Sequence, residues 1–214
     1  MSVVISFDMD GTLVKSHYAD AVWLEGVPKV YAKEYGIPLE KAKDLLFKQY
    51  AEVSEQRMEW YDIAYWFQRF RLKTDWHEVL QSYAEVIEPY EEVHEVLRNL
   101  HGKVPLIVCS NAKKEFIDIQ LQTTGLSRYF THMFSSITDF QLVKKDTSFY
   151  QQVCDILDIR PDELYHVGDH REFDFQSPQS IGINAYHLDR TAKILDDSTF
   201  PSLKEFYMNI YKTL

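Results

Sequence analysis

Cysteine is scarce in this sequence. Only two cysteines occur among 214 residues, Cys109 and Cys154, which excludes a disulfide framework and leaves no pair at metal-knuckle spacing. Both lie in apolar stretches, where free thiols are commonly buried. We therefore expect two inert thiols that contribute only to packing.

Long apolar runs and positive charge are also lacking. No run approaches the roughly 20 apolar residues that a membrane-spanning helix needs, and the first residues lack the basic and apolar segments of a secretory signal. Lys and Arg number 23 against 33 Asp and Glu, a net charge of -10, whereas nucleic-acid-binding domains normally present a basic face. We therefore predict a cytoplasmic monomer or homodimer that binds neither membrane nor nucleic acid.

The chain does contain an alternation of short apolar runs with amphipathic segments. The runs are rich in β-branched and aromatic residues, as buried parallel strands are, and stand at residues 3–7, 104–109, 132–135, 165–167 and 184–188. Apolar residues at spacings of three and four predict helices at residues 91–100, 115–123 and 148–157. Such alternation produces parallel βαβ units, which bind ligands at the carboxyl ends of the strands.

Residues 15–86 break this alternation, because they read as consecutive helices with no strand. All four tryptophans fall in this segment: Trp23, Trp60, Trp66 and Trp76. They indicate a bundle filled by bulky side chains or, alternatively, aromatic side chains that face a cleft. The predicted fold is α/β: a Rossmann-like open parallel sheet flanked by helices (residues 1–14 and 87–214), with an inserted all-helical domain (15–86).

The strongest chemical signal directly follows the first expected strand, in the heptapeptide Phe-Asp-Met-Asp-Gly-Thr-Leu at residues 7–13. Two carboxylates at this spacing lie on the same side of an extended chain. A turn at Gly11 would let Asp8 and the backbone of Asp10 reach one metal ion through oxygen ligands, as magnesium requires. A turn alone would explain only the Asp-Gly pair.

This heptapeptide resembles the first signature of the haloacid dehalogenase-like hydrolase superfamily. The second signature is a hydroxyl residue that ends the second core strand, and Ser110 stands there, followed by Asn111. The third is a lysine ahead of a helix. Lys144 aligns best, and Lys145 is kept as the alternative because it replaces the proline that usually follows this lysine.

The fourth signature, Gly-Asp-x-x-x-x-Asp after an apolar strand, is matched by Gly168, Asp169 and Asp174. The four matches come in the expected order and cover most of the core. The insert matches only in position and helical character, and it stands where the superfamily places its first type of helical cap. The resemblance therefore implies a helical cap over a phosphatase-like core.

The resemblance also implies a mechanism. Asp8 would attack phosphorus and carry the phosphoryl group as an aspartyl phosphate, while Asp10 would act first as general acid and then as general base. The dehalogenase branch typically lacks the second aspartate and needs no metal, so Asp10 favours phosphoryl chemistry. The implied reaction is hydrolysis of a small phosphorylated metabolite.

The implied cofactor is Mg²⁺, held by Asp8, the backbone carbonyl of Asp10 and Asp169, with Asp174 in direct or water-mediated support. The phosphoryl oxygens would be bound by three residues: Ser110, Asn111 and Lys144.

Two alternatives stay open beside the phosphatase. The first is a phosphosugar mutase that uses the same phosphoenzyme, and the second is a non-catalytic binding module on this fold. Three arginines of the insert are candidates to meet an anionic substrate, against the ordinary alternative of solvated surface residues: Arg57, Arg69 and Arg71.

Overall fold

The computed structural model describes residues 3–191 and 197–211; the remaining residues of the predicted core range lie outside the described residues. The described chain contains a six-stranded parallel sheet of order β3-β2-β1-β4-β5-β6. The strands are β1 Val4–Phe7, β2 Leu106–Ser110, β3 His132–Ser135, β4 Leu164–Gly168, β5 Asn184–Leu188 and β6 Thr199–Phe200. The α/β prediction is thus confirmed, with β6 as a strand that the sequence did not indicate.

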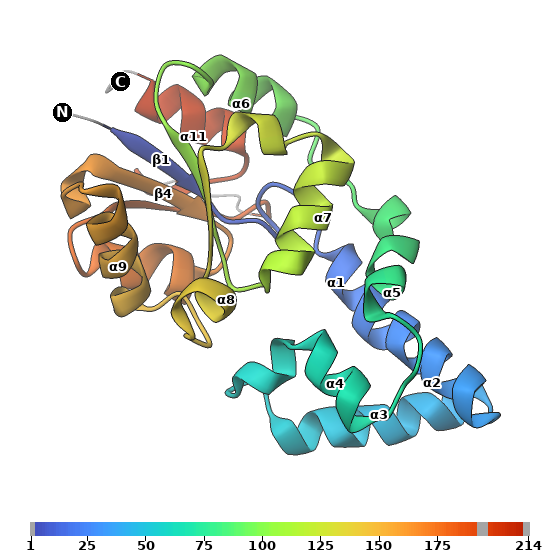
Figure 1. The fold of residues 1–214 in the computed structure, drawn as a ribbon. Helices are drawn as coiled ribbons and strands as arrows, with labels where there is room; N and C mark the ends of the chain where they lie inside the picture. Colours follow the sequence, from blue (N-terminus) through green and yellow to red (C-terminus); the bar gives the residue numbers. More distant parts are fainter. Residues whose placement is uncertain (1–2, 192–196, 212–214) are drawn as a thin grey trace.

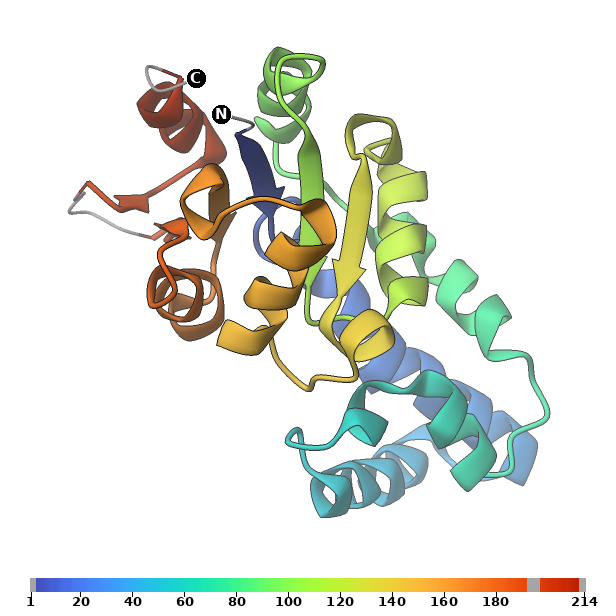
Figure 2. The same cartoon turned by 60° about the vertical axis from the view of Figure 1, so that its left-hand side comes forward.

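Helices cover both faces of the sheet (Figures 1 and 2). One face packs against α6 Val93–Leu100, α7 Lys114–Thr124 and α11 Leu203–Ile210, and the other packs against α9 Thr147–Leu157. Alternate residues of β1 separate the two layers, since Ile5 and Phe7 face the first and Val4 faces the second. Two short helices complete this lobe: α8 Ser136–Phe140 and α10 Ser177–Gln179.

Between β1 and β2 the chain forms helices and turns only, as expected for residues 15–86, which we call the helical insert. Its α-helices are α1 His17–Ala21, α2 Val27–Tyr35, α3 Leu39–Val53, α4 Ile63–Arg69 and α5 Trp76–Ser82. A π-helical segment, Val22–Gly26, joins α1 to α2, and 3-10 turns occur at Met58–Tyr61 and Ala84–Val86. Figure 1 shows the insert as a second lobe beside the sheet.

The chain enters and leaves the helical insert through two adjacent segments. The Lys15 amide donates to the Glu88 carbonyl at 2.9 Å, and the Tyr90 amide donates to the Leu13 carbonyl at 3.2 Å. An apolar contact also joins the lobes, because the ring of Trp23 stacks on that of Phe116 in α7 with centroids 5.8 Å apart. The insert is therefore held next to the carboxyl end of β1.

Two further expectations concern burial and membranes. Cys109 and Cys154 are both buried and unpaired, as expected. Within residues 3–191 and 197–211, no helix has the length and apolar character needed to cross a membrane.

Candidate active site

The candidate site forms where three neighbouring parallel strands end. Asp8 follows β1, Ser110 closes β2, and Asp169 follows β4. Because β1 lies between β2 and β4 in the sheet, their carboxyl ends bring these residues to one edge. The topology thus gathers side chains from distant parts of the chain.

Three carboxylates cluster at this edge. Asp8, Asp169 and Asp174 each present an oxygen within 4.8 Å of the others; Asp8 and Asp174 are buried, and Asp169 is exposed. Two glycines permit the approach. A Cβ on Gly11, which has φ +81°, would lie 2.1 Å from Asp169 Oδ2, and a Cβ on Gly168 would lie 2.4 Å from Asp174 Cγ. A cluster of hard oxygen donors this close fits a divalent cation such as Mg²⁺.

Among the residues that the structure describes, Lys145 is the cation in this cluster, whereas the sequence favoured Lys144. Lys145 is fully buried; its Nζ contacts Asp8 Oδ1, lies 2.5 Å from Asp174 Oδ1 and donates to the Cys109 carbonyl at 2.9 Å. Lys144 instead has its Nζ 5.0 Å from the ring centroid of Tyr61.

The backbone of the loop before α9 explains which lysine points inward. The amide of Lys145 donates to Asn111 Oδ1 at 2.7 Å, which ties this residue to the end of β2. Asp146 caps α9 by accepting from the amides of Ser148 and Phe149, so the loop is fixed on both sides of Lys145. Asn111 thus braces the loop through its amide oxygen, in addition to lining a cavity beside Asp10.

The charged groups of the cluster shift one another's pKa values. Burial alone would raise the pKa of Asp174, but Lys145 and His166 outweigh it and hold that pKa below its usual range. Burial raises the pKa of Asp8 well above its usual value, against the opposing effect of Lys145, and the neighbouring acids Asp174 and Asp169 add to the rise. One lysine therefore offsets only part of the negative charge, which a bound divalent cation would balance.

Asp174 lies in a position that supports the cluster from behind. Its Oδ1 pairs with Lys145 and lies 3.0 Å from His166 Nε2, and its Oδ2 accepts from the His170 amide at 3.0 Å. His166 Nδ1 in turn lies 2.8 Å from Ser6 Oγ. Burial lowers the pKa of His166, so a neutral ring can donate to Asp174 and accept from Ser6. His166 is itself a residue of β4, and its full burial follows from the packing of the sheet.

Asp10 sits at the mouth of the site, partly exposed, and its Oδ1 accepts a hydrogen bond from Gln120 Nε2 at 2.9 Å. Burial raises the pKa of Asp10 to about 6, against the lowering effect of the Gln120 hydrogen bond. Sequence reasoning missed Gln120. Its signal was a polar residue on the apolar face of α7, where Ile117 and Leu121 are also buried.

Three further contacts of the first turn were missed. Thr12 Oγ1 donates to Asp8 Oδ2 at 3.2 Å. Arg190 donates to the carbonyls of Gly11 (3.3 Å) and Thr12 (2.8 Å), and its Nη1 pairs with Glu92 at 2.8 Å. The turn that carries the two aspartates is therefore fixed by a side chain from beyond β5, a contact with no local sequence signal.

Ser110 lies at the end of β2, nearly fully buried, and its Oγ accepts from the Ala112 amide at 3.1 Å. This leaves the hydroxyl proton for an anion at the strand ends.

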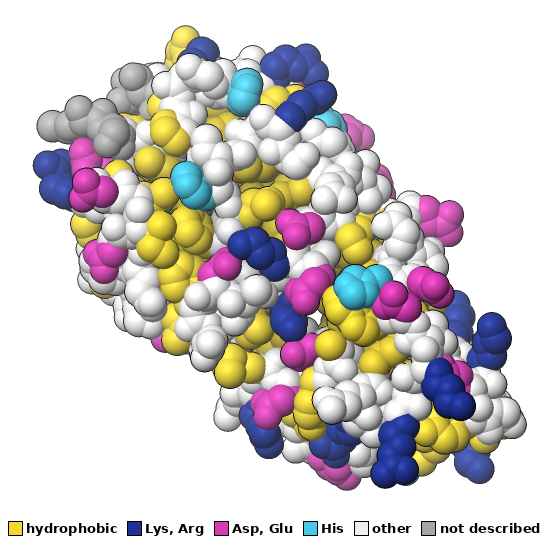
Figure 3. Space-filling view, in the orientation of Figure 1, with side chains coloured by type: hydrophobic (Ala, Val, Ile, Leu, Met, Phe, Trp, Pro, Cys, Tyr) yellow, Lys and Arg dark blue, Asp and Glu magenta, His cyan; other side chains and the backbone are white. Residues whose placement is uncertain are grey.

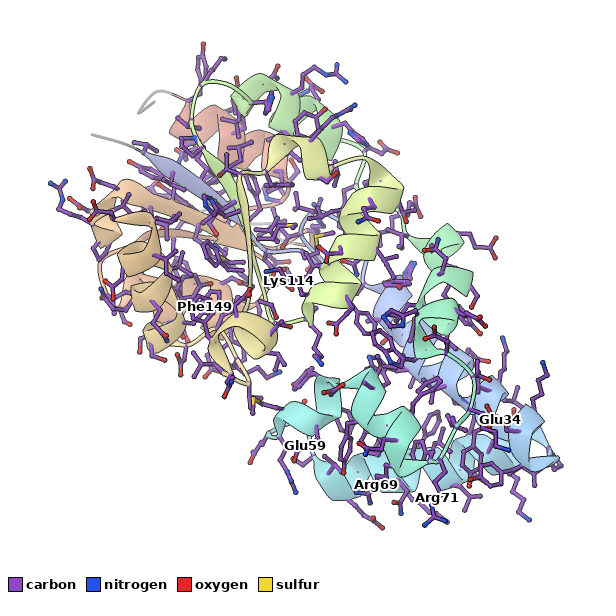
Figure 4. The ribbon with its side chains drawn as sticks, in the orientation of Figure 1. Glu34, Glu59, Arg69, Arg71, Lys114 and Phe149 are labelled. Atoms are coloured by element: carbon purple, nitrogen blue, oxygen red, sulfur yellow. The ribbon has the colours of Figure 1, made fainter. Side chains whose placement is uncertain are left out.

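The arginines of the insert do not point at this cluster. Arg57 pairs with Glu59, Arg69 donates to Gln49 and Tyr65, and Figure 4 shows Arg69 and Arg71 on the side of the insert away from the sheet. Figure 3 shows Lys and Arg side chains gathered on the end of the insert farthest from the sheet. Positively and negatively charged side chains are mixed where the two lobes meet.

Two enzymes are similar to this chain in sequence, and one solved phosphatase structure is similar to it in fold. The pyrophosphatase PpaX of Bacillus cereus (strain B4264) is 25% identical over 199 residues, which cover 88% of this chain and 84% of that protein. The GMP/IMP nucleotidase YrfG of Escherichia coli (strain K12) is 23% identical over 167 residues, which cover 77% and 73%. The solved HAD phosphatase of Thermococcus onnurineus matches the fold with a TM-score of 0.79, at 22% identity and 97% coverage of both chains.

A family model described as haloacid dehalogenase-like hydrolase matches residues 3–182, which is most of the chain and includes every site residue discussed so far except Arg190. The chain therefore belongs to the haloacid dehalogenase-like hydrolase family.

Proposed function

We propose that this chain is a magnesium-dependent phosphatase that hydrolyses a small phosphorylated metabolite through an aspartyl phosphate on Asp8. The proposal rests on one arrangement: Asp8 contacts the buried Lys145 and shares a cluster with Asp169 and Asp174. A carboxylate can attack a phosphate dianion only when cations offset the repulsion between them. This site combines the carboxylate, a fixed cation and acids that suit a divalent ion.

Mg²⁺ would be held by Asp8, Asp169 and the backbone carbonyl of Asp10. Asp174 contacts Lys145, His166 and the His170 amide behind the cluster, so we assign it the role of support through water and through Lys145. When bound, the ion would offset phosphate charge and polarise the phosphoryl group.

The residues of the chain carry out two steps. In the first, Asp8 forms a bond to phosphorus, the bond from phosphorus to the leaving oxygen breaks, and Asp10 gives that oxygen a proton. The Ser110 hydroxyl donates to a phosphoryl oxygen, and the charge of the Lys145 ammonium offsets that of the phosphoryl group. In the second, Asp10 takes a proton from the water that attacks the aspartyl phosphate, which releases phosphate and restores Asp8.

The environment of Asp10 supports this double role. A pKa of about 6 lets the carboxyl exist in both protonation states near neutral pH.

The mutase alternative uses the same first step and differs only in the acceptor, and the binding-module alternative leaves the assembled acids without a role. The helical insert is proposed to act as a cap that excludes water and selects the leaving group. Location in the cytoplasm and a monomeric or homodimeric state remain predictions.

The test is hydrolysis of p-nitrophenyl phosphate by the purified protein with magnesium. Turnover should require the metal, stop with a chelator and be lost in Asp8→Asn. Asp44→Asn, on the exposed face of α3, is the matched control and should retain activity. Undiminished turnover in Asp8→Asn would falsify the nucleophile assignment, and conversion of a hexose 1-phosphate to its isomer without phosphate release would favour the mutase.

A further inference from the structure

Two cavities adjoin one another and extend from Asp10 into the helical insert. The first, of about 300 Å³, is lined by Asp10 and by Phe116 of α7, and the second, of about 320 Å³, lies within the insert. Asp20, Trp23 and Trp60 line both. We call the combined space the aromatic trough; its aromatic wall residues are Trp23, Phe47, Tyr50, Trp60, Tyr61 and Phe116.

Four of these aromatic rings contact one another. Trp23 stacks on Phe116 with an angle of 14° between the rings, and Tyr50 meets Trp23 and Trp60 edge to face with centroids 6.1 and 5.9 Å away. Tyr50 is nearly fully buried, and among the described residues its hydroxyl has no hydrogen-bond partner. Aromatic side chains that line a cavity can pack against a flat ligand, and the Tyr50 hydroxyl would gain a partner if a polar ring atom reached it.

The charge of the trough is negative. Asp10 and Asp20 contribute carboxylates, and no ion pair involves Asp20 in the described part of the chain. Lys113 is the cation on the described wall, but its Nζ is already 3.0 Å from Asp62 Oδ2 and 3.7 Å from Glu115 Oε1. A leaving group with a second phosphate or a carboxylate would therefore meet repulsion, whereas ring N–H groups would find acceptors.

We propose that the aromatic trough binds the leaving group of the substrate, and that this group carries a flat heteroaromatic ring that is uncharged or cationic, as in a nucleoside monophosphate. The inference rests on the proposed phosphatase function, because the phosphate at Asp8 places the leaving group beyond Asp10, at the opening of the trough. Stacking selects the ring, and Asp20 selects against anionic groups. A sugar phosphate without a base leaves the aromatic wall unused.

The experiment compares kcat/KM for a nucleoside 5′-monophosphate, ribose 5-phosphate and phosphoglycolate, with acetyl phosphate as a small reference substrate. We expect the nucleotide to exceed ribose 5-phosphate at least about tenfold, the effect of stacking one base on aromatic side chains. Trp60→Ala should reduce that ratio toward one. Trp76→Ala, a tryptophan of α5 outside the trough, is the matched control and should preserve the ratio. Asp20→Asn should raise kcat/KM for phosphoglycolate relative to that for ribose 5-phosphate.

The outcomes separate the two proposals. Turnover of acetyl phosphate with equal kcat/KM for the nucleotide and ribose 5-phosphate overturns the trough assignment and leaves the phosphatase standing. Absence of turnover with every substrate overturns the phosphatase. In that case the trough is judged from tryptophan fluorescence of Asp8→Asn with magnesium: a saturable change with the nucleotide and none with ribose 5-phosphate supports it, and equal responses overturn it.

Discussion

At the scale of single residues, two adjacent lysines point in opposite directions, and the consequences of removing each should differ. Lys145→Met removes the cation that contacts Asp8 and Asp174. We expect kcat to fall about 100- to 1000-fold, as for loss of one preorganised donor, and stability to fall by about 3–5 kcal/mol because buried carboxylates lose their partner.

Lys144→Met is the matched comparison, because this side chain lies against Tyr61 rather than in the cluster. Lys144→Met should lower kcat and the free energy of unfolding far less than Lys145→Met does. Steady-state kinetics and urea denaturation measure both quantities. Equal losses in the two variants would contradict the placement of Lys145.

Gln120 should act as a positioning residue for Asp10. Gln120→Leu removes a hydrogen bond to a carboxylate, which is worth about 1.5–3 kcal/mol, so steps that need Asp10 should slow about 10- to 100-fold. An alkyl phosphate needs its leaving oxygen protonated, whereas the p-nitrophenolate leaving group departs without protonation. Turnover of an alkyl phosphate should therefore fall more than turnover of p-nitrophenyl phosphate. Gln122→Leu, on the exposed side of α7, is the control. A uniform loss across both substrates would indicate a merely structural role.

At the scale of elements, Arg190 and Glu92 join the turn after β1 to α6 and α11. Glu92 Oε1 accepts from Arg190 at 2.8 Å and from the Leu203 amide at 3.3 Å. Burial alone would raise the pKa of Glu92, but the hydrogen bond from Arg190 and its charge lower it below the usual 4.5. The unfolded chain binds the Glu92 proton more readily than the folded chain does. The stabilisation is therefore complete above pH 4.5 and is lost as the pH falls through the pKa of Glu92 in the folded protein.

Glu92→Gln should therefore lower the free energy of unfolding by about 1.5–3 kcal/mol near neutral pH, the range for a hydrogen bond to a charged group. The difference from the unsubstituted protein should shrink as the pH is lowered below 4.5. Urea denaturation at several pH values measures it, with Glu91→Gln, an exposed neighbour, as the control. A difference that does not change with pH would contradict the ionic origin of this stability.

The elements themselves show what a sequence can and cannot predict. β1 and β2 are buried at every position, so they appear as mainly apolar runs, whereas β6 has only two residues and gives no pattern. Spacing within motifs placed Asp8 and Asp169 at strand ends. The choice between two lysines depended on Asn111, which is 34 positions away, and Gln120 meets Asp10 across 110 positions. Such partners depend on tertiary packing, and even the polar Gln120 on the apolar face of α7 does not reveal locally which residue it meets.

At the scale of the whole molecule, the ion pair of Lys113 with Asp62 joins the two lobes, in addition to the linkers and the contact of Trp23 with Phe116. Lys113 precedes α7 of the sheet lobe, and Asp62 caps α4 of the helical insert by accepting from two amides. The side chains are 16% and 32% exposed, so the pair is partly screened and worth up to about 1 kcal/mol. Within the proposed function, a bond of this size would favour a closed insert over the site while still allowing it to open.

Lys113→Met should therefore raise KM by up to about fivefold with a smaller effect on kcat, because the closed form loses one weak stabilising contact. Added salt should raise KM in the unsubstituted protein for the same reason and have less effect in the variant. Lys114→Met is the control, because Lys114, labelled in Figure 4, pairs with Asp139 at 3.1 Å within the sheet lobe and joins no second lobe. If both variants keep the same KM and the same salt dependence, the pair does not govern closure, and the apolar contact of Trp23 with Phe116 must hold the lobes together instead.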